Sequence, residues 1–153
     1  EISLGLVGSE MCIRDRDISG YAYAGVFKDR AAYRWAVETT VYVREDMKKM
    51  GTGRELYAAL EKILSMQNIL NLNACIAYPC EAEDPYLTRD SVQFHKRLGY
   101  QFAGKFHRCG YKFGRWYHMI WMEKFLGGHT ENPPAVKSFD EVRSLIADKL
   151  GIW

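Results

Sequence analysis

Apolar residues along this chain follow two different spacings, and together these spacings predict an alternation of strands and helices. Runs of β-branched, aromatic and other apolar residues predict five strands, over residues 18–27, 33–43, 72–78, 101–111 and 115–125. Lys112-Phe113-Gly114 joins the last two strands and predicts a hairpin. Apolar residues at helical spacing predict helices over residues 54–66, over 88–98 and from 138 onward. Gly99 is expected to end the second helix. The apolar faces of the first and third helices consist of Leu56, Leu60, Ile63 and Leu64, and of Phe139, Val142, Leu145, Ile146 and Leu150. The resulting order, β-β-α-β-α-β-β-α, is typical of an α/β fold.

The composition narrows the class of protein further. The chain has 153 residues, of which 48% are hydrophobic and 26% charged, as in an ordinary globular domain. The net charge of +2 gives no electrostatic case for a nucleic-acid partner. No apolar run approaches the roughly 20 residues that would span a bilayer. An aromatic content of 14% is weak evidence for a concave binding site.

The four cysteines, at positions 12, 75, 80 and 109, form no motif. None of their spacings is Cys-x-x-Cys, and no pair of histidines follows at zinc-ligand distance. We expect the thiols of a reduced cytosolic protein and no metal site.

The first sixteen residues differ from the rest of the chain. They are no signal peptide, because their only basic residues, Arg14 and Arg16, come last. Residues 5–16 back-translate without a mismatch onto a sequence that resembles the transposase adapter joined to DNA fragments before sequencing. We therefore expect residues 1–16 to be translated adapter and exclude them from the fold.

A glycine-containing loop between a predicted strand and a predicted helix carries the most chemistry. Gly51 and Gly53 leave the backbone accessible where the helix begins, and helix N-termini favour phosphate groups. Lys48, Lys49 and Arg54 add positive charge. The pattern fits neither a Walker loop nor a dinucleotide fingerprint. On the glycines alone, a plain strand-to-helix turn with surface lysines remains the alternative.

The residues around this loop resemble a known superfamily. Val41-Tyr42-Val43 followed by Lys48, Gly51 and Gly53 resembles motif A of the GNAT acetyltransferases. The blocks GYAYAGVF, AYRWAVETTVYV, SVQFHKRLGY and GYKFGRWY resemble the phosphinothricin N-acetyltransferase family, over residues 18–125. The resemblance implies an α/β (α+β) GNAT fold, with a mixed central sheet flanked by helices. It also implies transfer of the acetyl group of acetyl-CoA to a small amino-acid-like amine, such as phosphinothricin, methionine sulfoximine or methionine sulfone.

The resemblance also implies which residues hold acetyl-CoA. They lie on the strand end, the loop and the two helix starts: Val41, Tyr42, Val43, Lys48, Lys49, Met50, Gly51, Thr52, Gly53, Arg54, Thr88 and Ser91. Lys48 replaces the usual Gln or Arg. Thr88 stands where members often have an Asn, and residues 80–87 form an insertion.

Two residues are candidates for catalysis. Glu38 lies in the middle of an apolar strand, where burial would raise its pKa towards that of a useful base, or where it could simply face solvent or an ion-pair partner. The resemblance assigns the base role to Glu38. His95 is by itself an ordinary helical histidine, and the resemblance implies that it protonates the coenzyme A thiolate or relays the amine's proton.

The acceptor is expected to meet the segment before the catalytic strand. The resemblance implies binding by Arg30, Ala31, Ala32 and Tyr33. Arg30 or Lys28 could pair with a carboxylate or phosphinate of the acceptor, or could be solvated loop charges.

Family members carry a strand, two helices and another strand before the GYAYA block. We therefore expect residues 17–126 to be a partial GNAT domain without its N-terminal strands and helices, and 127–153 to be an extension with a short helix. Its first strand, predicted to be central and buried on both faces, would expose an edge. We expect the chain alone to be poorly soluble and inactive until roughly 70 upstream residues are restored.

The full-length protein is expected to be a cytoplasmic homodimer without nucleic-acid or membrane partners. Two other functions stay open at this stage. The enzyme could acetylate another amine, such as an aminoglycoside or a peptide N-terminus, or the chain could be an inactive truncated fragment that binds coenzyme A.

Overall fold

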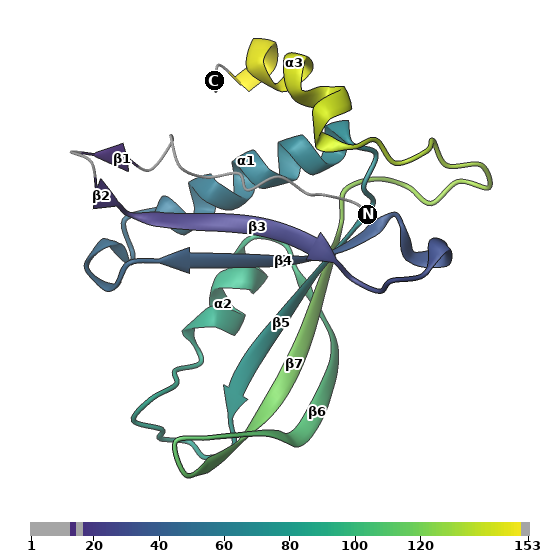
Figure 1. The fold of residues 1–153 in the computed structure, drawn as a ribbon. Coiled ribbons are helices and arrows are strands. Elements are labelled where there is room, and N and C mark those ends of the chain that lie inside the picture. The colour runs from purple at the N-terminus through teal and green to yellow at the C-terminus, as the bar shows by residue number, and fades with distance from the viewer. Residues whose placement is uncertain (1–12, 15–16, 151–153) are drawn as a thin grey trace. The chain divides into compact units, whose positions relative to one another are not determined.

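The computed structural model describes residues 13–14 and 17–150, in two compact units (Figure 1). Of the described residues, one unit contains 13–14, 17–72 and 125–150, and the other contains 73–124. The predicted adapter segment therefore lies almost entirely outside the described residues. Its last part borders a small ladder in which β1 (Ile13–Arg14) pairs antiparallel with β2 (Asp17–Ile18).

The first unit is built on an antiparallel pair of strands, β3 (Gly20–Val26) and β4 (Ala36–Val43). Helix α1 (Thr52–Met66) contacts both strands, and α3 (Phe139–Leu150) contacts α1 (Figure 1). The predicted strand 33–43 begins later than expected, because residues Ala31–Tyr33 form a 3₁₀ turn, η1. A second 3₁₀ turn, η2 (Glu45–Met47), follows β4.

The strand predicted to be buried on both faces is instead buried on one. Ala22 and Ala24 of β3 are buried, whereas Tyr21 is exposed and Tyr23 is half-buried. This alternation is what a two-residue side-chain period gives when only one face of a sheet is covered. The buried face packs on α1, whose four predicted core residues are all buried: Leu56, Leu60, Ile63 and Leu64.

The C-terminal segment is tied to the first unit by hydrogen bonds from residues far away in sequence. The Trp35 indole donates to the Pro134 carbonyl at 2.8 Å, and Asn68 donates through Nδ2 to the Ala135 carbonyl at 2.8 Å. The buried Gln67 donates to the Lys137 carbonyl at 3.1 Å and its own carbonyl accepts from Lys137 N–H at 3.0 Å. These bonds lead the chain directly to the start of α3.

Helix α3 begins at Phe139, directly after Ser138, where the amphipathic stretch was predicted to start, and it has a reciprocal cap. The Glu141 carboxylate accepts from Ser138 N–H at 2.6 Å, while the Ser138 hydroxyl accepts from Glu141 N–H at 3.3 Å. This cap lowers the pKa of Glu141. Val142 and Ile146 are buried as predicted, but Leu145, expected on the same apolar stripe, is 41% exposed. The buried stripe is therefore narrower than the sequence pattern suggested.

The second unit consists of three strands and one helix. Strands β5 (Asn71–Pro79), β7 (Arg115–Phe125) and β6 (Gln101–Lys112) are neighbours in this order, and β6 pairs antiparallel with β7. The predicted hairpin is confirmed: Phe113 and Gly114 both have positive φ, of 53° and 71°, as a two-residue turn of type I′ requires.

Helix α2 (Asp90–Arg97) is shorter than predicted. It begins two residues after Thr88, because the Thr88 hydroxyl accepts a hydrogen bond from Asp90 N–H at 3.3 Å and holds the chain in a turn there. Gly99, with φ of 89°, follows the end of the helix as predicted.

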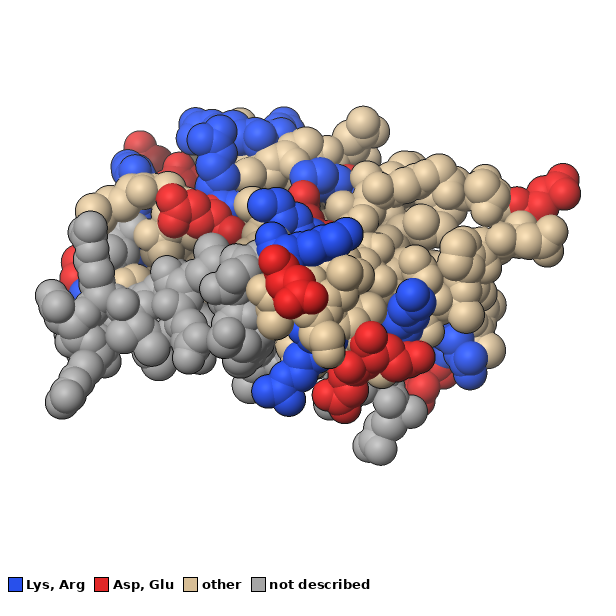
Figure 2. Space-filling view, turned by 90° about the horizontal axis from the view of Figure 1, so that it is seen from above, with Lys and Arg blue, Asp and Glu red and all other residues tan. Residues whose placement is uncertain are grey.

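Charge is mixed over the surface shown in Figure 2, where basic and acidic side chains lie next to one another. Within residues 13–14 and 17–150, no helix combines the length and the apolar character needed to cross a membrane. The same residues contain no cluster of three or more potential metal ligands. Cys75 and Cys80 are half-buried thiols, and Cys109 is exposed.

Candidate functional site

The glycine loop leads into helix α1 through a backbone conformation that favours glycine. Gly51 precedes the first helical residue with φ of 92° and ψ of −11°, in the left-handed region. A Cβ atom built on Gly51 would meet nothing within 4 Å, so the space over this residue is open. The first bond of the helix joins Glu55 N–H to the Gly51 carbonyl at 3.1 Å. The N–H groups of the first turn, from Thr52 to Arg54, thus have no acceptor inside the helix and can bind an anion.

The charges around the loop are only partly those expected. Lys48 forms an ion pair with Glu45, whereas Lys49 and Arg54 are exposed. Arg44, which the sequence did not single out, donates to both carboxylate oxygens of Asp46, at 2.6 and 3.0 Å. These hydrogen bonds lower the pKa of Asp46.

The same arginine connects the loop to the strand pair through its backbone. Arg44 N–H donates to the carbonyl of the buried Ser19 at 2.9 Å, just before β3. Met50 is 64% exposed. An anion at the loop would meet the backbone amides and the side chains of Lys49 and Arg54.

Glu38 lies on the face of β4 that points away from α1. Its neighbours Val37 and Thr39 are buried on the opposite face, and Glu38 itself is half-buried. Directly across the ladder stands Gly25, and a Cβ atom built there would meet nothing within 4 Å. The carboxylate thus has free space beside it. Among residues 13–14 and 17–150, no ion pair of Glu38 is present.

Tyrosines share this face with Glu38. The register places Tyr21 opposite Tyr42 and Tyr23 opposite Thr40. The ring of Tyr21 lies 5.2 Å from that of Tyr42 and 6.3 Å from that of Tyr23, measured between centroids. Sequence reasoning assigned Tyr42 to the cofactor and missed Tyr21 and Tyr23, although their two-residue spacing in the GYAYAGV segment places them on one face.

Thr39, the residue next to Glu38 in β4, connects this strand to helix α1 on the opposite face. The buried Thr39 hydrogen-bonds to the hydroxyl of Tyr57 on α1, and burial raises the pKa of Tyr57 to about 12. Tyr57 therefore stays neutral at any physiological pH. This bond joins the strand that carries Glu38 to the helix that begins at the glycine loop.

The predicted acceptor segment forms the 3₁₀ turn η1 and is exposed throughout. Arg30 precedes the turn in an extended conformation, and its carbonyl accepts from Tyr33 N–H at 3.0 Å. Ala31 and Ala32 lie between them, with small side chains. The ammonium of Lys28 lies 5.5 Å from the centre of the Phe27 ring. Arg30 is thus the more available of the two cations named for this segment.

His95 belongs to the second unit and is buried in α2. Its Nδ1 lies 2.7 Å from the carbonyl oxygen of Ser91, and its ring meets those of Phe94 and Tyr100 edge-on. Burial lowers the pKa of His95, which outweighs the opposite effect of the Ser91 carbonyl. Because a carbonyl only accepts, Nδ1 carries the proton of the neutral ring and Nε2 carries the lone pair.

The two other predicted cofactor residues of this unit have local structural roles. The Thr88 hydroxyl accepts from Asp90 N–H, and the carbonyl of Ser91 accepts from His95. Glu38, the strand end, the glycine loop and the acceptor segment lie together in the first unit, whereas Thr88, Ser91 and His95 lie in the second.

Comparison with protein families and curated proteins gives consistent matches. A family model described as an acetyltransferase (GNAT) domain matches residues 11–121. The chain is 38% identical over 109 residues to a phosphinothricin N-acetyltransferase of Streptomyces viridochromogenes, covering 71% of the chain and 55% of that protein. It is 32% identical over 107 residues to an L-methionine sulfoximine/L-methionine sulfone acetyltransferase of Pseudomonas paraeruginosa, covering 70% of the chain and 58% of that protein. The chain therefore spans little more than half the length of these relatives.

Comparison with solved structures also finds acetyltransferases. A GNAT superfamily phosphinothricin acetyltransferase of Sinorhizobium meliloti, in complex with acetyl-CoA, is similar with a TM-score of 0.66 and 28% identity. That match covers 85% of this chain and 64% of the other. A protein of Salmonella typhimurium, solved with acetyl-CoA and described as a putative acetyltransferase, has a TM-score of 0.67 and 27% identity, with coverage of 77% and 63%.

Proposed function

Because the chain belongs to the GNAT acetyltransferase family, we propose that its protein transfers the acetyl group of acetyl-CoA to the amine of a small amino-acid-like acceptor. Phosphinothricin and methionine sulfoximine or sulfone are the acceptor types, since relatives named for them are 32–38% identical. The observation that carries the proposal is the first unit itself. It joins an anion-binding helix start to a strand with a carboxylate that faces open space.

The loop fits the pyrophosphate of acetyl-CoA. The left-handed backbone at Gly51 and the absence of side chains over it leave the first-turn amides of α1 accessible. Backbone amides and the helix dipole favour a doubly charged pyrophosphate. Lys49 and Arg54 add charge at the edge of the loop. When bound, acetyl-CoA supplies the thioester from which the acetyl group leaves.

Glu38 acts as the base in this proposal. An amine attacks a thioester only after its ammonium has lost a proton, and a positioned carboxylate accepts that proton directly or through a water molecule. The missing side chain at Gly25 leaves room for the amine or the water next to Glu38. Tyr21, Tyr23 and Tyr42 give this face an aromatic wall.

His95 relays protons in this proposal. Its lowered pKa keeps the ring neutral near pH 7, and its Nε2 lone pair accepts a proton. Of the two roles considered for His95, the relay of the amine's proton fits a neutral ring. Direct protonation of the thiolate would require a charged one.

Arg30 binds the acidic end of the acceptor in this proposal. Its guanidinium is exposed at the start of η1, and a planar guanidinium pairs bidentately with a carboxylate or phosphinate. Tyr33 and the two small alanines complete the segment.

The direct test is an acetylation assay with a panel of amines. Phosphinothricin, methionine sulfoximine, methionine sulfone, an aminoglycoside and a short peptide are each incubated with acetyl-CoA, and the released thiol is measured. Both the 153-residue chain and, where the gene extends upstream, the longer product are assayed. Turnover of the first three alone supports the proposal. Preference for the aminoglycoside or the peptide would contradict the proposed acceptor class and would show that the enzyme acetylates another kind of amine.

The remaining alternative is a fragment that binds coenzyme A without turnover. Calorimetric titration with coenzyme A distinguishes it, because binding with no acetylation of any amine in either form of the protein would favour it. A homodimer and a cytoplasmic location complete the proposal. The mass of the full gene product in solution tests the first, and cell fractionation tests the second.

A further inference from the structure

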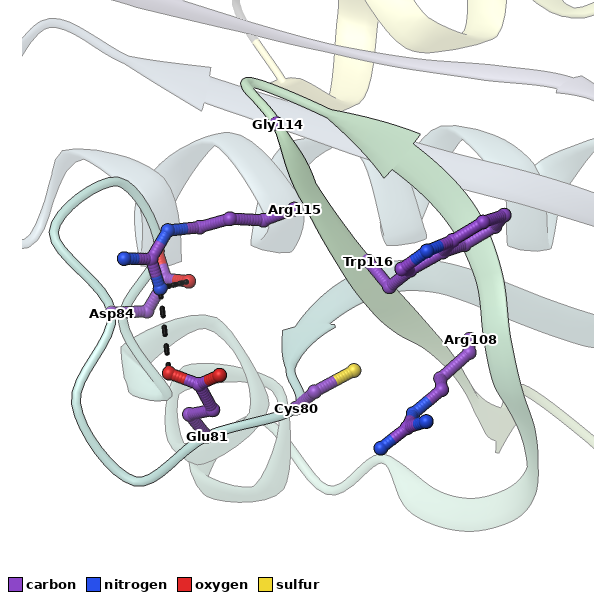
Figure 3. A pocket seen from close by; sticks show the side chains of 7 residues that line it. All are labelled: Cys80, Glu81, Asp84, Arg108, Gly114, Arg115 and Trp116. Carbon is purple, nitrogen blue, oxygen red and sulfur yellow. Dashed lines mark hydrogen bonds and ion pairs between the residues drawn. The ribbon is translucent and has the colours of Figure 1, made fainter.

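The second unit contains a cavity that has no part in the chemistry proposed above. Its volume is about 460 Å³, within the range of small-molecule sites. The residues that shape it come from the insertion after β5 and from the β6–β7 hairpin (Figure 3): Cys80, Glu81, Asp84, Arg108, Arg115 and Trp116. None of them is a predicted catalytic, cofactor or acceptor residue.

One wall of the cavity is an ion-pair cluster of Arg115, Glu81 and Asp84, in which one carboxylate can still bind a second cation. Arg115 Nη1 lies 3.5 Å from Glu81 and 3.6 Å from Asp84, both longer than a strong charge-assisted hydrogen bond. The Asp84 side chain is only 4% exposed, and its Oδ1 accepts from Tyr86 N–H and Leu87 N–H, each at 2.9 Å. Asp84 is thus the fixed counter-ion of Arg115. The Glu81 side chain is 75% exposed and retains an oxygen for a second cation.

The other wall presents a positive charge. Between Phe106 and Gly110 the β6–β7 register shifts, so that three residues of β6 face one residue of β7. Arg108 stands in this bulge with φ of 49°, and its N–H donates to Nδ1 of His118 at 3.0 Å. Figure 3 shows the Arg108 side chain directed into the cavity. Among the described residues, its guanidinium has no carboxylate partner.

Trp116 also lines the cavity, and Figure 3 shows its indole directed away from Glu81 and Arg115. The residue is 55% exposed, and its ring packs against that of Tyr111, with the ring centroids 5.0 Å apart. A buried or supported indole of this kind binds flat and apolar groups without a large ordering cost.

We infer that this cavity binds a zwitterionic amino acid, with the carboxylate on Arg108, the ammonium on Glu81 and an apolar side chain on the side of the cavity that Trp116 lines. Opposite charges on the two walls select a ligand that carries both. A simple anion would be attracted by Arg108 but repelled by Glu81. A simple ammonium ion would be attracted by Glu81 but repelled by Arg108. The site requires no acetyl-CoA and shares no residue with the proposed acceptor segment at residues 28–33.

The test is calorimetric titration of the 153-residue chain with L-phenylalanine in the absence of acetyl-CoA. Arg108→Gln and Glu81→Gln should each weaken binding at least tenfold. The matched controls Arg97→Gln and Glu131→Gln, which remove the same charges from exposed positions outside the cavity, should leave binding unchanged. A thermal melt of every variant confirms that it is folded.

Ligand analogues that lack one charge then show which protein residue binds the ammonium and which binds the carboxylate. N-acetyl-L-phenylalanine lacks the ammonium, so its weaker binding should be insensitive to Glu81→Gln. L-phenylalaninamide lacks the carboxylate, so its binding should be insensitive to Arg108→Gln. This is the logic of a double-mutant cycle. Binding of acetate or ethylamine as tightly as L-phenylalanine, equal loss in the control variants, or no binding of L-phenylalanine to the folded chain would each overturn the inference.

Discussion

At the scale of single residues, two buried tyrosines differ in whether the hydroxyl group is hydrogen-bonded. The Tyr57 hydroxyl is hydrogen-bonded to Thr39, whereas the Tyr117 hydroxyl is buried without a partner among the described residues. Burial, followed by the charge of Asp84, raises the pKa of Tyr117 as well. An unsatisfied buried polar group destabilises a protein, so equal substitutions should have unequal effects.

Tyr57→Phe should lower the free energy of unfolding by about 1–3 kcal/mol, because it leaves the Thr39 hydroxyl without this partner. Tyr117→Phe removes a hydroxyl that bonds to nothing and should leave stability unchanged or increase it by about 1 kcal/mol. Urea denaturation of both variants measures the difference. A larger loss for Tyr117→Phe than for Tyr57→Phe would contradict the assigned bonding.

His95 makes the stability of the fold depend on pH. Burial lowers its pKa below the ordinary value of 6.5, so the unfolded chain takes up a proton first as pH falls. The contribution of neutral His95 is therefore present above about pH 6.5 and is lost between that pH and its lower folded pKa. His95→Asn keeps a donor for the Ser91 carbonyl but does not titrate. The wild type should lose more stability than this variant between pH 7 and pH 5, and parallel curves would be the contrary result.

A substitution of Gly51 tests whether the glycine loop binds coenzyme A. Gly51→Val places a branched side chain over the first-turn amides and forces it into a left-handed conformation. We expect at least a tenfold loss of coenzyme A affinity, about 1.4 kcal/mol. Gly114→Val is the control, because Gly114 also has a positive φ and open space but lies in the hairpin. Equal affinities in titrations of wild type and Gly51→Val would exclude the loop from the site.

At the scale of elements, α3 packs on α1 of the same unit through a narrow apolar stripe. Ile146 is completely buried, whereas Leu145, its neighbour, is 41% exposed. Ile146→Ala should therefore lower the free energy of unfolding by about 2–5 kcal/mol, and Leu145→Ala by much less. Chemical denaturation gives both values. Equal small losses would mean that α3 is not part of the core.

The order of the elements could be predicted from the sequence because strand and helix periods differ clearly. Four details could not. The 3₁₀ turn at Ala31–Tyr33 and the late start of α2 depend on local hydrogen bonds that compete with regular structure. The exposure of Leu145 depends on where α3 meets α1. The first strand is covered on only one face, which its apolar sequence did not reveal.

Parts of the candidate site could likewise be predicted from the sequence, and other parts could not. The glycine loop and Glu38 were identified from local motifs and from the family resemblance they carry. The Arg44–Asp46 pair was missed because charged loop residues have no spacing that distinguishes a bonded pair from a solvated one. The cavity of the second unit was missed because it joins residues 34 positions apart, Glu81 and Arg115, with a bulged Arg108.

At the scale of the whole molecule, membership of the GNAT family and the local geometry of each unit support one chemistry. The first unit contains the helix start, the Glu38 carboxylate and the segment proposed to bind the acceptor. The second supplies a neutral buried histidine and a separate charged cavity. Because the chain spans little more than half of its named relatives, its own turnover is the central claim to be tested.

The most direct measurement is the rate at which the protein acetylates L-methionine sulfone, compared with that of Glu38→Gln. Amide and carboxylate have nearly the same shape, but the amide cannot accept the proton. We expect acetylated product from the wild type, a kcat about 10²-fold lower in the variant, and unchanged coenzyme A binding in both. Equal rates at every pH would make Glu38 a structural residue and would contradict the account.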